Sequence, residues 1–151
     1  MNKNNKTAFL VINIWGPIII GTIIYYLISP DVLFVEWIDT FLGKVMHISC
    51  IDSSFWLVKF IRNYMLDMMW GYALVFALYF IIGNNSADLL KIFVIALTLS
   101  AVMEILQLTP FVEGTFDVLD IIVEFLAEVV AVFIIKKYFL EEVQKRYEKK
   151  G

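Results

Sequence analysis

The chain has 151 residues, which is room for one domain spanning residues 1–151. Hydrophobic residues make up 61% of it and charged residues 18%, whereas a typical soluble domain has about 45–50% and about 25%. A chain this short cannot hide so much apolar surface from water, so the composition argues against a soluble globular protein and against disorder. The net charge of −3 gives no reason to expect nucleic-acid binding.

The first of four apolar segments covers about residues 8–28. A membrane-spanning helix needs about 20 mostly apolar residues, and this segment is too long for the core of a signal peptide. No small-x-small cleavage pattern follows it, so we expect a retained span. Pro17 would kink this helix, which membrane helices tolerate, and Asn13 is expected to make an interhelical hydrogen bond.

The first loop, residues 29–63, is more than a linker. Residues 32–46 place apolar side chains at helical spacing with polar ones opposite, and Ser29-Pro30-Asp31 is a good helix start. The pattern predicts an amphipathic helix lying in the outer membrane interface. A second helix start at Asp52-Ser53-Ser54 leads without a break into the second span.

The remaining apolar segments cover about residues 65–82, 89–109 and 118–135. The second and fourth spans are short, so neighbouring residues must extend them or the bilayer must thin. The tail, residues 136–151, alternates charges and is expected to extend the last helix into the cytoplasm. The sequence therefore predicts an all-α integral membrane protein: a bundle of four transmembrane helices with an outer interfacial amphipathic helix.

The basic residues set the orientation, because Lys and Arg concentrate in cytoplasmic loops. With both termini in the cytoplasm, nine basic residues lie inside and three lie outside, namely Lys44, Lys59 and Arg62. This arrangement places the first loop and the short third loop, residues 110–117, on the outer face.

Acidic residues inside the apolar segments are the most informative feature of the sequence. Four of them in and beside the fourth segment are spaced by three, four and four, which places them on one helix face: Asp117, Asp120, Glu124 and Glu128. The last lies roughly 15 Å beyond the first, about half of a ~30 Å hydrocarbon core. An acid at the centre of a span costs on the order of 2.5–3.5 kcal/mol, and this segment has no basic residue to offset that cost.

Glu104 on the third span, with Gln107 one turn later, adds another carboxylate. In one interpretation these acids face the bundle interior and form a polar site that holds a cation, a proton or a polar lipid headgroup. In a second, protonated acids hydrogen-bond to neighbouring helices and fix the packing of the bundle. In a third, the fourth segment lies flat with its acids in water. Asp67, near the start of the second span, is expected to pair with Arg62 or Lys59 or to lie in water.

The sequence has one cysteine, Cys50, and one histidine, His47. This excludes several common kinds of catalytic and metal site. One cysteine cannot form an internal disulfide or a thiolate metal cluster. His47 has no neighbouring Cys or Ser motif that would make a nucleophile–base pair. We expect no metal and no other cofactor.

Residues 104–120 read EILQLTPFVEGTFDVLD. This stretch resembles the motif of VanZ-like membrane proteins: an E-x-x-Q that ends one span, a proline-containing outer loop, and an F-D-x-x-D that opens the next. Residues 63–74 also look like the family's second conserved region, and the resemblance covers roughly residues 63–135. The family's polar positions match five residues of this chain: Glu104, Gln107, Pro110, Asp117 and Asp120.

Three positions depart from the family's pattern. The usual loop arginine is replaced by Gly114, the asparagine one turn after the aspartate by Glu124, and the glycine that follows it by Ala127. Loss of the arginine removes the obvious countercharge for the acids. Either Lys59 or Arg62 substitutes for it, or the chain is a divergent member of the family.

The resemblance implies a multi-pass protein of the bacterial cytoplasmic membrane and cell envelope. It places the chain near a family whose name member is associated with low-level resistance to glycopeptide antibiotics, teicoplanin in particular. We expect an outward-facing acidic pocket that binds a lipid headgroup, a cell-wall precursor or a cation. Its residues would be Glu104, Gln107, Asp117 and Asp120, deepened by Glu124 and Glu128.

Two alternatives stay open. One is a small intramembrane enzyme that acts on a lipid-linked substrate, with two facing carboxylates as acid and base. The lack of a nucleophile–base pair, of a His-rich metal motif and of a phosphate-cradling loop in the sequence argues against it. The other is a non-catalytic subunit whose acidic face docks another membrane protein.

Overall fold

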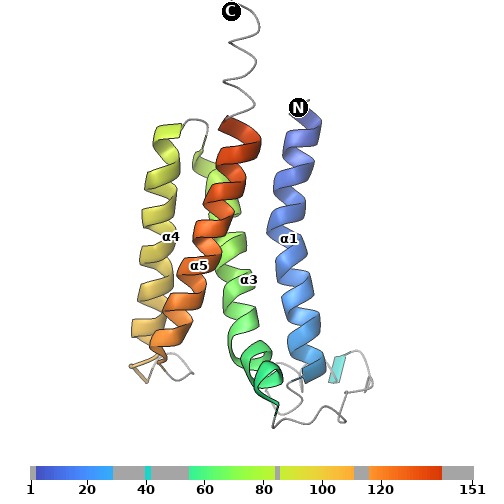
Figure 1. Cartoon of the computed structure of the whole chain (residues 1–151), viewed down its shortest axis with the longest axis vertical. Helices are drawn as coiled ribbons and strands as arrows, with labels where there is room; N and C mark the ends of the chain where they lie inside the picture. Colours follow the sequence, from blue (N-terminus) through green and yellow to red (C-terminus); the bar gives the residue numbers. More distant parts are fainter. Residues whose placement is uncertain (1–2, 29–39, 42–54, 84–85, 111–115, 141–151) are drawn as a thin grey trace, which may run out of the picture.

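The computed structural model describes residues 3–28, 40–41, 55–83, 86–110 and 116–140. Regular structure in these ranges is helical, which confirms the all-α prediction (Figure 1). The elements are α1 (Lys3–Ile28), α3 (Trp56–Ile82), α4 (Ser86–Leu106), α5 (Val118–Ile135) and a π-helical turn, η1 (Lys136–Leu140), that continues α5. The amphipathic helix predicted at residues 32–46 lies outside the described residues apart from 40–41, as does the tail beyond residue 140.

Three of the helices are long and apolar enough to cross a membrane: α1 over Asn4–Leu27, α3 over Trp56–Ile82 and α4 over Asp88–Leu106. Large apolar side chains are exposed on their outer faces, among them Ile12, Ile81 and Leu90, as expected of a surface in contact with lipid. These three helices indicate a membrane protein. The fourth long helix, α5, has 18 residues and carries three acids, so its composition alone does not mark it as a span.

The helix bounds follow the sequence closely at some ends and depart from it at others. α5 runs from residue 118 to residue 135, as predicted, and α3 begins at Trp56, just after the helix start expected at residues 52–54. α4 ends at Leu106 rather than at residue 109. The next three amide groups each bond a carbonyl three residues back, Thr109 N to Leu106 O for example. The helix stops here because Pro110 disfavours helical backbone at the residue before it.

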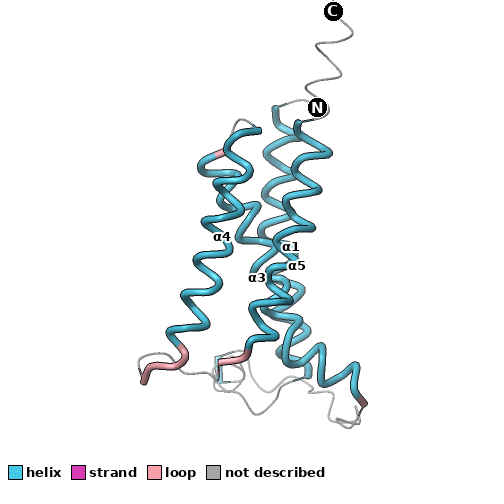
Figure 2. The backbone as a smooth tube through the Cα atoms, turned by 60° about the vertical axis from the view of Figure 1, so that its left-hand side comes forward, coloured by secondary structure: helices cyan, strands magenta, loops and turns pink. Residues whose placement is uncertain are grey.

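α3 lies at the centre of the bundle. It contacts α1, α4 and α5, and α4 also contacts α5. Figures 1 and 2 both show α1 along α3 and away from α4. Gly71 lets α3 approach α5, because a Cβ atom at this position would lie 3.3 Å from the carbonyl oxygen of Glu124. Gly21 does the same for α1, where a Cβ atom would lie 3.2 Å from Cβ of Met69.

A hydrogen bond also joins α1 to α3 and confirms the role expected for Asn13. The hydroxyl of Tyr72 donates to Asn13 Oδ1 at 2.6 Å. The same amide donates from Nδ2 to the carbonyl of Phe9 at 2.8 Å. α1 continues as a helix through Pro17.

Apolar and aromatic side chains close the end of the bundle that holds the N-terminus. The ring of Phe9 lies 6.3 Å from that of Phe76 and 5.6 Å from that of Phe139. The ammonium group of Lys6 lies 5.0 Å from the centre of the Phe139 ring and 5.7 Å from that of Tyr79, within range of cation–π attraction. The buried core extends from here along the bundle axis through Val75, Ile92, Ala96, Ala131 and Ile135.

Candidate functional site

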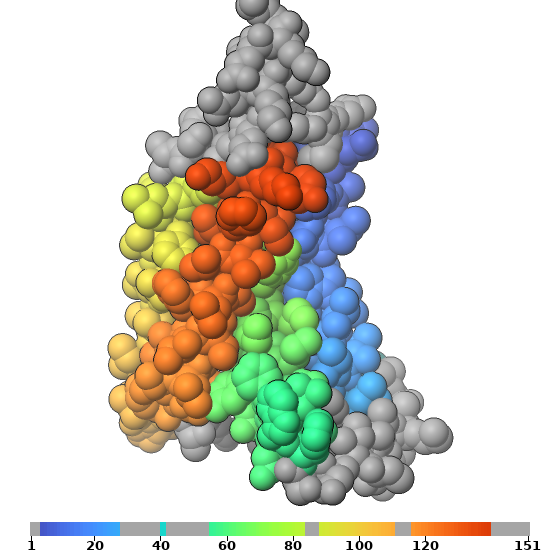
Figure 3. Space-filling view, in the orientation of Figure 1, coloured from blue at the N-terminus to red at the C-terminus, as the bar shows by residue number. Residues whose placement is uncertain are grey.

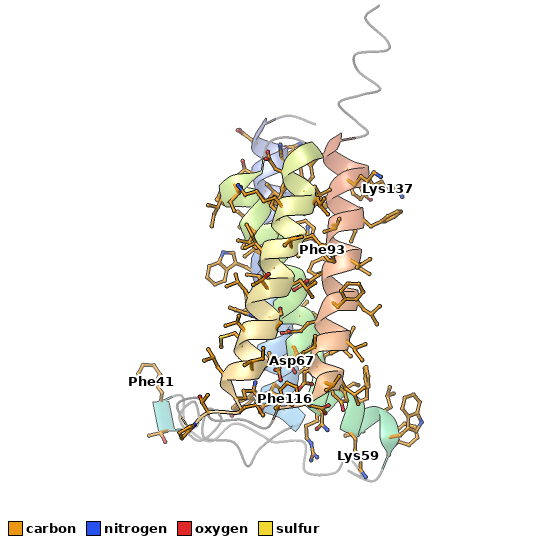
Figure 4. All side chains as sticks on the ribbon, turned by 90° about the vertical axis from the view of Figure 1, so that its left-hand side faces the viewer. Phe41, Lys59, Asp67, Phe93, Phe116 and Lys137 are labelled. Atoms are coloured by element: carbon orange, nitrogen blue, oxygen red, sulfur yellow. The ribbon has the colours of Figure 1, made fainter. Side chains whose placement is uncertain are left out.

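The acidic side chains gather toward the opposite end of the bundle. Figure 4 shows Asp67 near Phe116, just before α5, whereas Lys137 lies at the far end. Glu104 belongs to the last turn of α4 and is 5% exposed. One carboxylate therefore comes from α3 and one from α4.

Glu104 brings together three parts of the family-like motif. Its Oε1 accepts a hydrogen bond of 3.0 Å from Gln107 Nε2. Its Oε2 accepts one of 3.5 Å from the backbone N–H of Asp117. The E-x-x-Q spacing and the aspartate that opens the next helix are thus joined directly, and both donors to Glu104 are uncharged.

Asp117 has a structural role at the start of α5. It is the N-cap residue, and its Oδ1 accepts a hydrogen bond of 2.9 Å from Leu119 N, which satisfies one of the free amide groups of the first turn. Its Oδ2 accepts a bond of 3.3 Å from the hydroxyl of Tyr64 on α3. Both carboxylate oxygens of Asp117 are therefore occupied by protein donors.

Four acids from three helices interact electrostatically and are called the four-acid site below: Asp67, Glu104, Asp120 and Glu124. The charge of Asp67 acts on Asp120 and Glu124, and the charge of Glu104 acts on all three of the others. The structure thus brings the acids of the third and fourth predicted spans together, as the interior-facing interpretation requires.

Asp67 is the residue that sequence reasoning missed. It was expected to pair with Arg62 or Lys59 or to lie in water, yet it interacts with acids of α4 and α5. It also lines a cavity of about 270 Å³ between α1 and α3, together with Thr22 and Trp70. Its position inside an apolar segment was the available signal, because acids within spans are expensive and usually functional.

The candidate countercharges lie in the first two turns of α3, which begins at Trp56. Lys59 and Arg62 are both exposed, and Arg62 Nε donates to the neighbouring Asn63 at 3.4 Å. Figure 4 shows Lys59 at the tip of α3, well beyond Asp67. Within the described ranges neither side chain forms an ion pair with one of the four acids. Gly114, where the family carries its arginine, lies outside those ranges.

Glu124 and Glu128 reach deeper into the bundle. Both are buried, and Glu128 has no exposed surface. Ser100 on α4 donates a hydrogen bond of 3.0 Å from Oγ to Glu128 Oε1. The Oε2 atoms of both glutamates are buried without a hydrogen-bond partner among the residues that the structure describes. An unpaired buried oxygen is costly, so each of these two atoms lacks the hydrogen-bond donor that would offset its burial.

The chemistry of the four-acid site is that of a hydrogen-bond acceptor. Its carboxyl groups can take protons, ammonium groups or hydroxyl groups. No set of three or more His, Cys, Asp or Glu side chains in the described part of the chain has the arrangement needed to hold a metal ion. Comparison of the chain with protein-family models, with curated proteins and with solved structures gives no match.

Proposed function

We propose that the chain is a VanZ-like protein of the bacterial cytoplasmic membrane with four spans and both termini in the cytoplasm. Its four-acid site would bind, from the outer face, a headgroup that donates hydrogen bonds from ammonium or hydroxyl groups. The headgroup belongs to a lipid or to a lipid-linked cell-wall precursor. Three features support this proposal: the two faces of α5, the distribution of basic residues, and the unfilled acceptors of the site.

The two faces of α5 favour a fourth crossing. Its buried side chains include both glutamates, which pack inside the bundle, whereas Leu126, Val130 and Phe133 are at least half exposed. Figure 3 shows α5 at the surface of the bundle, next to α3. Lipid would therefore meet only apolar side chains. The 18 residues of α5 give about 27 Å at about 1.5 Å per residue, which is close to a ~30 Å hydrocarbon core.

The basic residues favour an outward-facing site. Lys6, Lys136 and Lys137 lie at the end closed by aromatic side chains, and Lys91 lies near the start of α4 at the same end. Four more basic residues follow Lys137 in the C-terminal tail: Lys145, Arg146, Lys149 and Lys150. Because cytoplasmic segments carry the excess of Lys and Arg, this end is assigned to the cytoplasm and the four-acid site to the outside.

The single observation that carries the ligand class is the unfilled Oε2 of Glu124, which is buried beside three other acids. The donors to Glu104 are neutral, and Lys59 lies at the tip of α3, beyond Asp67. A headgroup with ammonium or hydroxyl groups would supply the hydrogen-bond donor that Glu124 Oε2 lacks, whereas an anionic group would be repelled by the acids.

The test uses purified protein in nanodiscs that contain equal amounts of phosphatidylethanolamine and phosphatidylglycerol. The first lipid has an ammonium group and the second does not. Native mass spectrometry should find phosphatidylethanolamine retained in preference. Glu104→Gln and Asp120→Asn should each weaken its retention by about tenfold, which corresponds to the loss of about 1.4 kcal/mol. Asp88→Asn, near the opposite end of α4, is the matched control and should retain the lipid.

Unchanged retention in folded Glu104→Gln and Asp120→Asn proteins would show that the acids only fix helix packing. The link to antibiotic resistance is tested separately. Bacteria that express the wild-type chain should tolerate more teicoplanin than bacteria that express either variant at the same level. Equal tolerance would remove resistance from the proposal and leave headgroup binding to be judged by the nanodisc assay.

A further inference from the structure

A column of polar side chains continues from the four-acid site toward the middle of the bundle. Glu124 interacts electrostatically with Asp67 and Glu104 on one side and with Glu128 on the other. Ser100 of α4 ends the column with its hydrogen bond to Glu128. From Asp117 to Glu128 the helix rises about 16 Å, which is roughly half of the hydrocarbon core.

The column stops at Glu128. The next buried side chains toward the aromatic end are apolar, and none has more than 1% of its surface exposed: Val75, Phe76, Ile92, Ala96, Ala131 and Ile135. A charged or hydrated species cannot cross such a layer without a large desolvation cost. Solvent therefore does not reach Glu128 from the aromatic end of the bundle.

No described basic group faces the deep part of this column, around Glu124 and Glu128. The titratable side chains that act on Glu124 are Asp67 from α3, Glu104 from α4 and the neighbouring Glu128, all acidic. On α1, Lys6 lies against the rings of Tyr79 and Phe139 at the aromatic end. Two buried carboxylates without a cation are strongly unfavourable in a low-dielectric interior, so the pair needs a bound positive charge.

We propose that Glu124 and Glu128 form a proton-binding pair, filled and emptied only from the acidic end of the bundle. Ser100 occupies Oε1 of Glu128 as a donor, which leaves the unpartnered Oε2 as the oxygen that takes the proton. The proton comes from bulk water through the carboxyl groups of the four-acid site and returns by the same path. No bond other than O–H forms or breaks. A metal ion is the weaker occupant, because the described acids do not form a three-ligand cluster.

The experiment is infrared difference spectroscopy of the full chain in liposomes made without phosphatidylethanolamine, so that the readout is independent of headgroup binding. At neutral pH the wild-type protein should show a carbonyl-stretch band of protonated carboxylic acid. The band should shift in D₂O, because the proton exchanges with water. Glu128→Gln and Glu124→Gln should each remove one component of the band, and Asp88→Asn should remove none from this pair.

Ser100→Ala tests which oxygen of Glu128 carries the proton. It should shift the frequency of the component lost in Glu128→Gln without removing it, because the hydrogen bond to Oε1 is lost while the proton stays on Oε2. Absence of a protonated-carboxyl band in the wild-type protein at neutral pH would overturn the proposal. Loss of the band on addition of Na⁺ at constant pH would also overturn it and assign the pair to a monovalent cation.

Discussion

Gly71 is a point of close approach between α3 and α5. A Cβ atom there would lie 3.3–3.4 Å from three atoms of Glu124, whereas one at Gly16 meets nothing within 4 Å. Alanine at either position gains helix propensity of up to about 1 kcal/mol. At residue 71 this gain is opposed by crowding against α5.

We therefore expect Gly71→Ala to be less stable than Gly16→Ala by about 1 kcal/mol. The free energy of unfolding, measured by denaturant titration in mixed micelles, provides the comparison. Equal stability of the two variants would show that α3 and α5 separate at no cost, and the position assigned to Glu124 would then be wrong.

Ser100 is the second residue that tests the site directly. Ser100→Ala removes the donor to Glu128 and leaves a buried oxygen unpaired, at an expected cost of about 1–3 kcal/mol in unfolding free energy. Thr98→Ala is the control on the same helix, because this exposed hydroxyl bonds only its own turn through the Val94 carbonyl. Its effect should stay within about 0.5 kcal/mol. A cost as small for Ser100→Ala would contradict the hydrogen bond.

Single residues show where sequence reasoning succeeds and where it stops. The hydrogen bond of Asn13 could be predicted, because an amide in lipid must find a partner. Spacing also placed Glu124 and Glu128 on one face of α5, and both are buried, whereas Asp120 on the same face is half-buried. The neighbours of Asp67 could not be predicted. Spacing tells which face of its own helix a residue occupies, but it does not tell which other helix packs against that face.

The pairing of α1 with α3 is the feature that matters most at the level of elements. Tyr72→Phe removes the 2.6 Å bond to Asn13 and should lower the free energy of unfolding by about 0.6 kcal/mol, a typical value for interhelical bonds in membranes. Tyr138→Phe, at a half-exposed position of η1, is the control and should change little. A larger loss in the control than in Tyr72→Phe would place the stabilising contact elsewhere.

Apolar length predicted the existence of the four long helices well. The bounds of α5 match, because the N-cap at Asp117 and the switch to Lys136 are local signals. The end of α4 was predicted too late, because residues 107–109 are compatible with a helix in composition and only the effect of Pro110 on its predecessor ends it. The predicted outer helix at residues 32–46 stays a prediction.

The two ends of the bundle differ in chemical character. One end is closed by aromatic rings, and the other holds the four-acid site. A groove of about 560 Å³ opens among α1, α3 and α5, lined by side chains such as Ile20, Met68 and Leu126. Sequence spacing could predict an acidic face on one helix. It could not predict that acids of three helices meet at one end, because that depends on how the helices pack.

The central claim is that α5 crosses the membrane with its acidic end outside, and thiol accessibility tests it most directly. Val118 and Tyr138 are about half exposed, at 55% and 48%, near the two ends of the α5–η1 helix. In a background with Cys50→Ser, single Val118→Cys and Tyr138→Cys variants are treated with a membrane-impermeant maleimide in intact bacterial cells. The account predicts that Val118→Cys reacts in intact cells and Tyr138→Cys only after lysis. Reaction of both from the same side would contradict the fourth span and the outward-facing site.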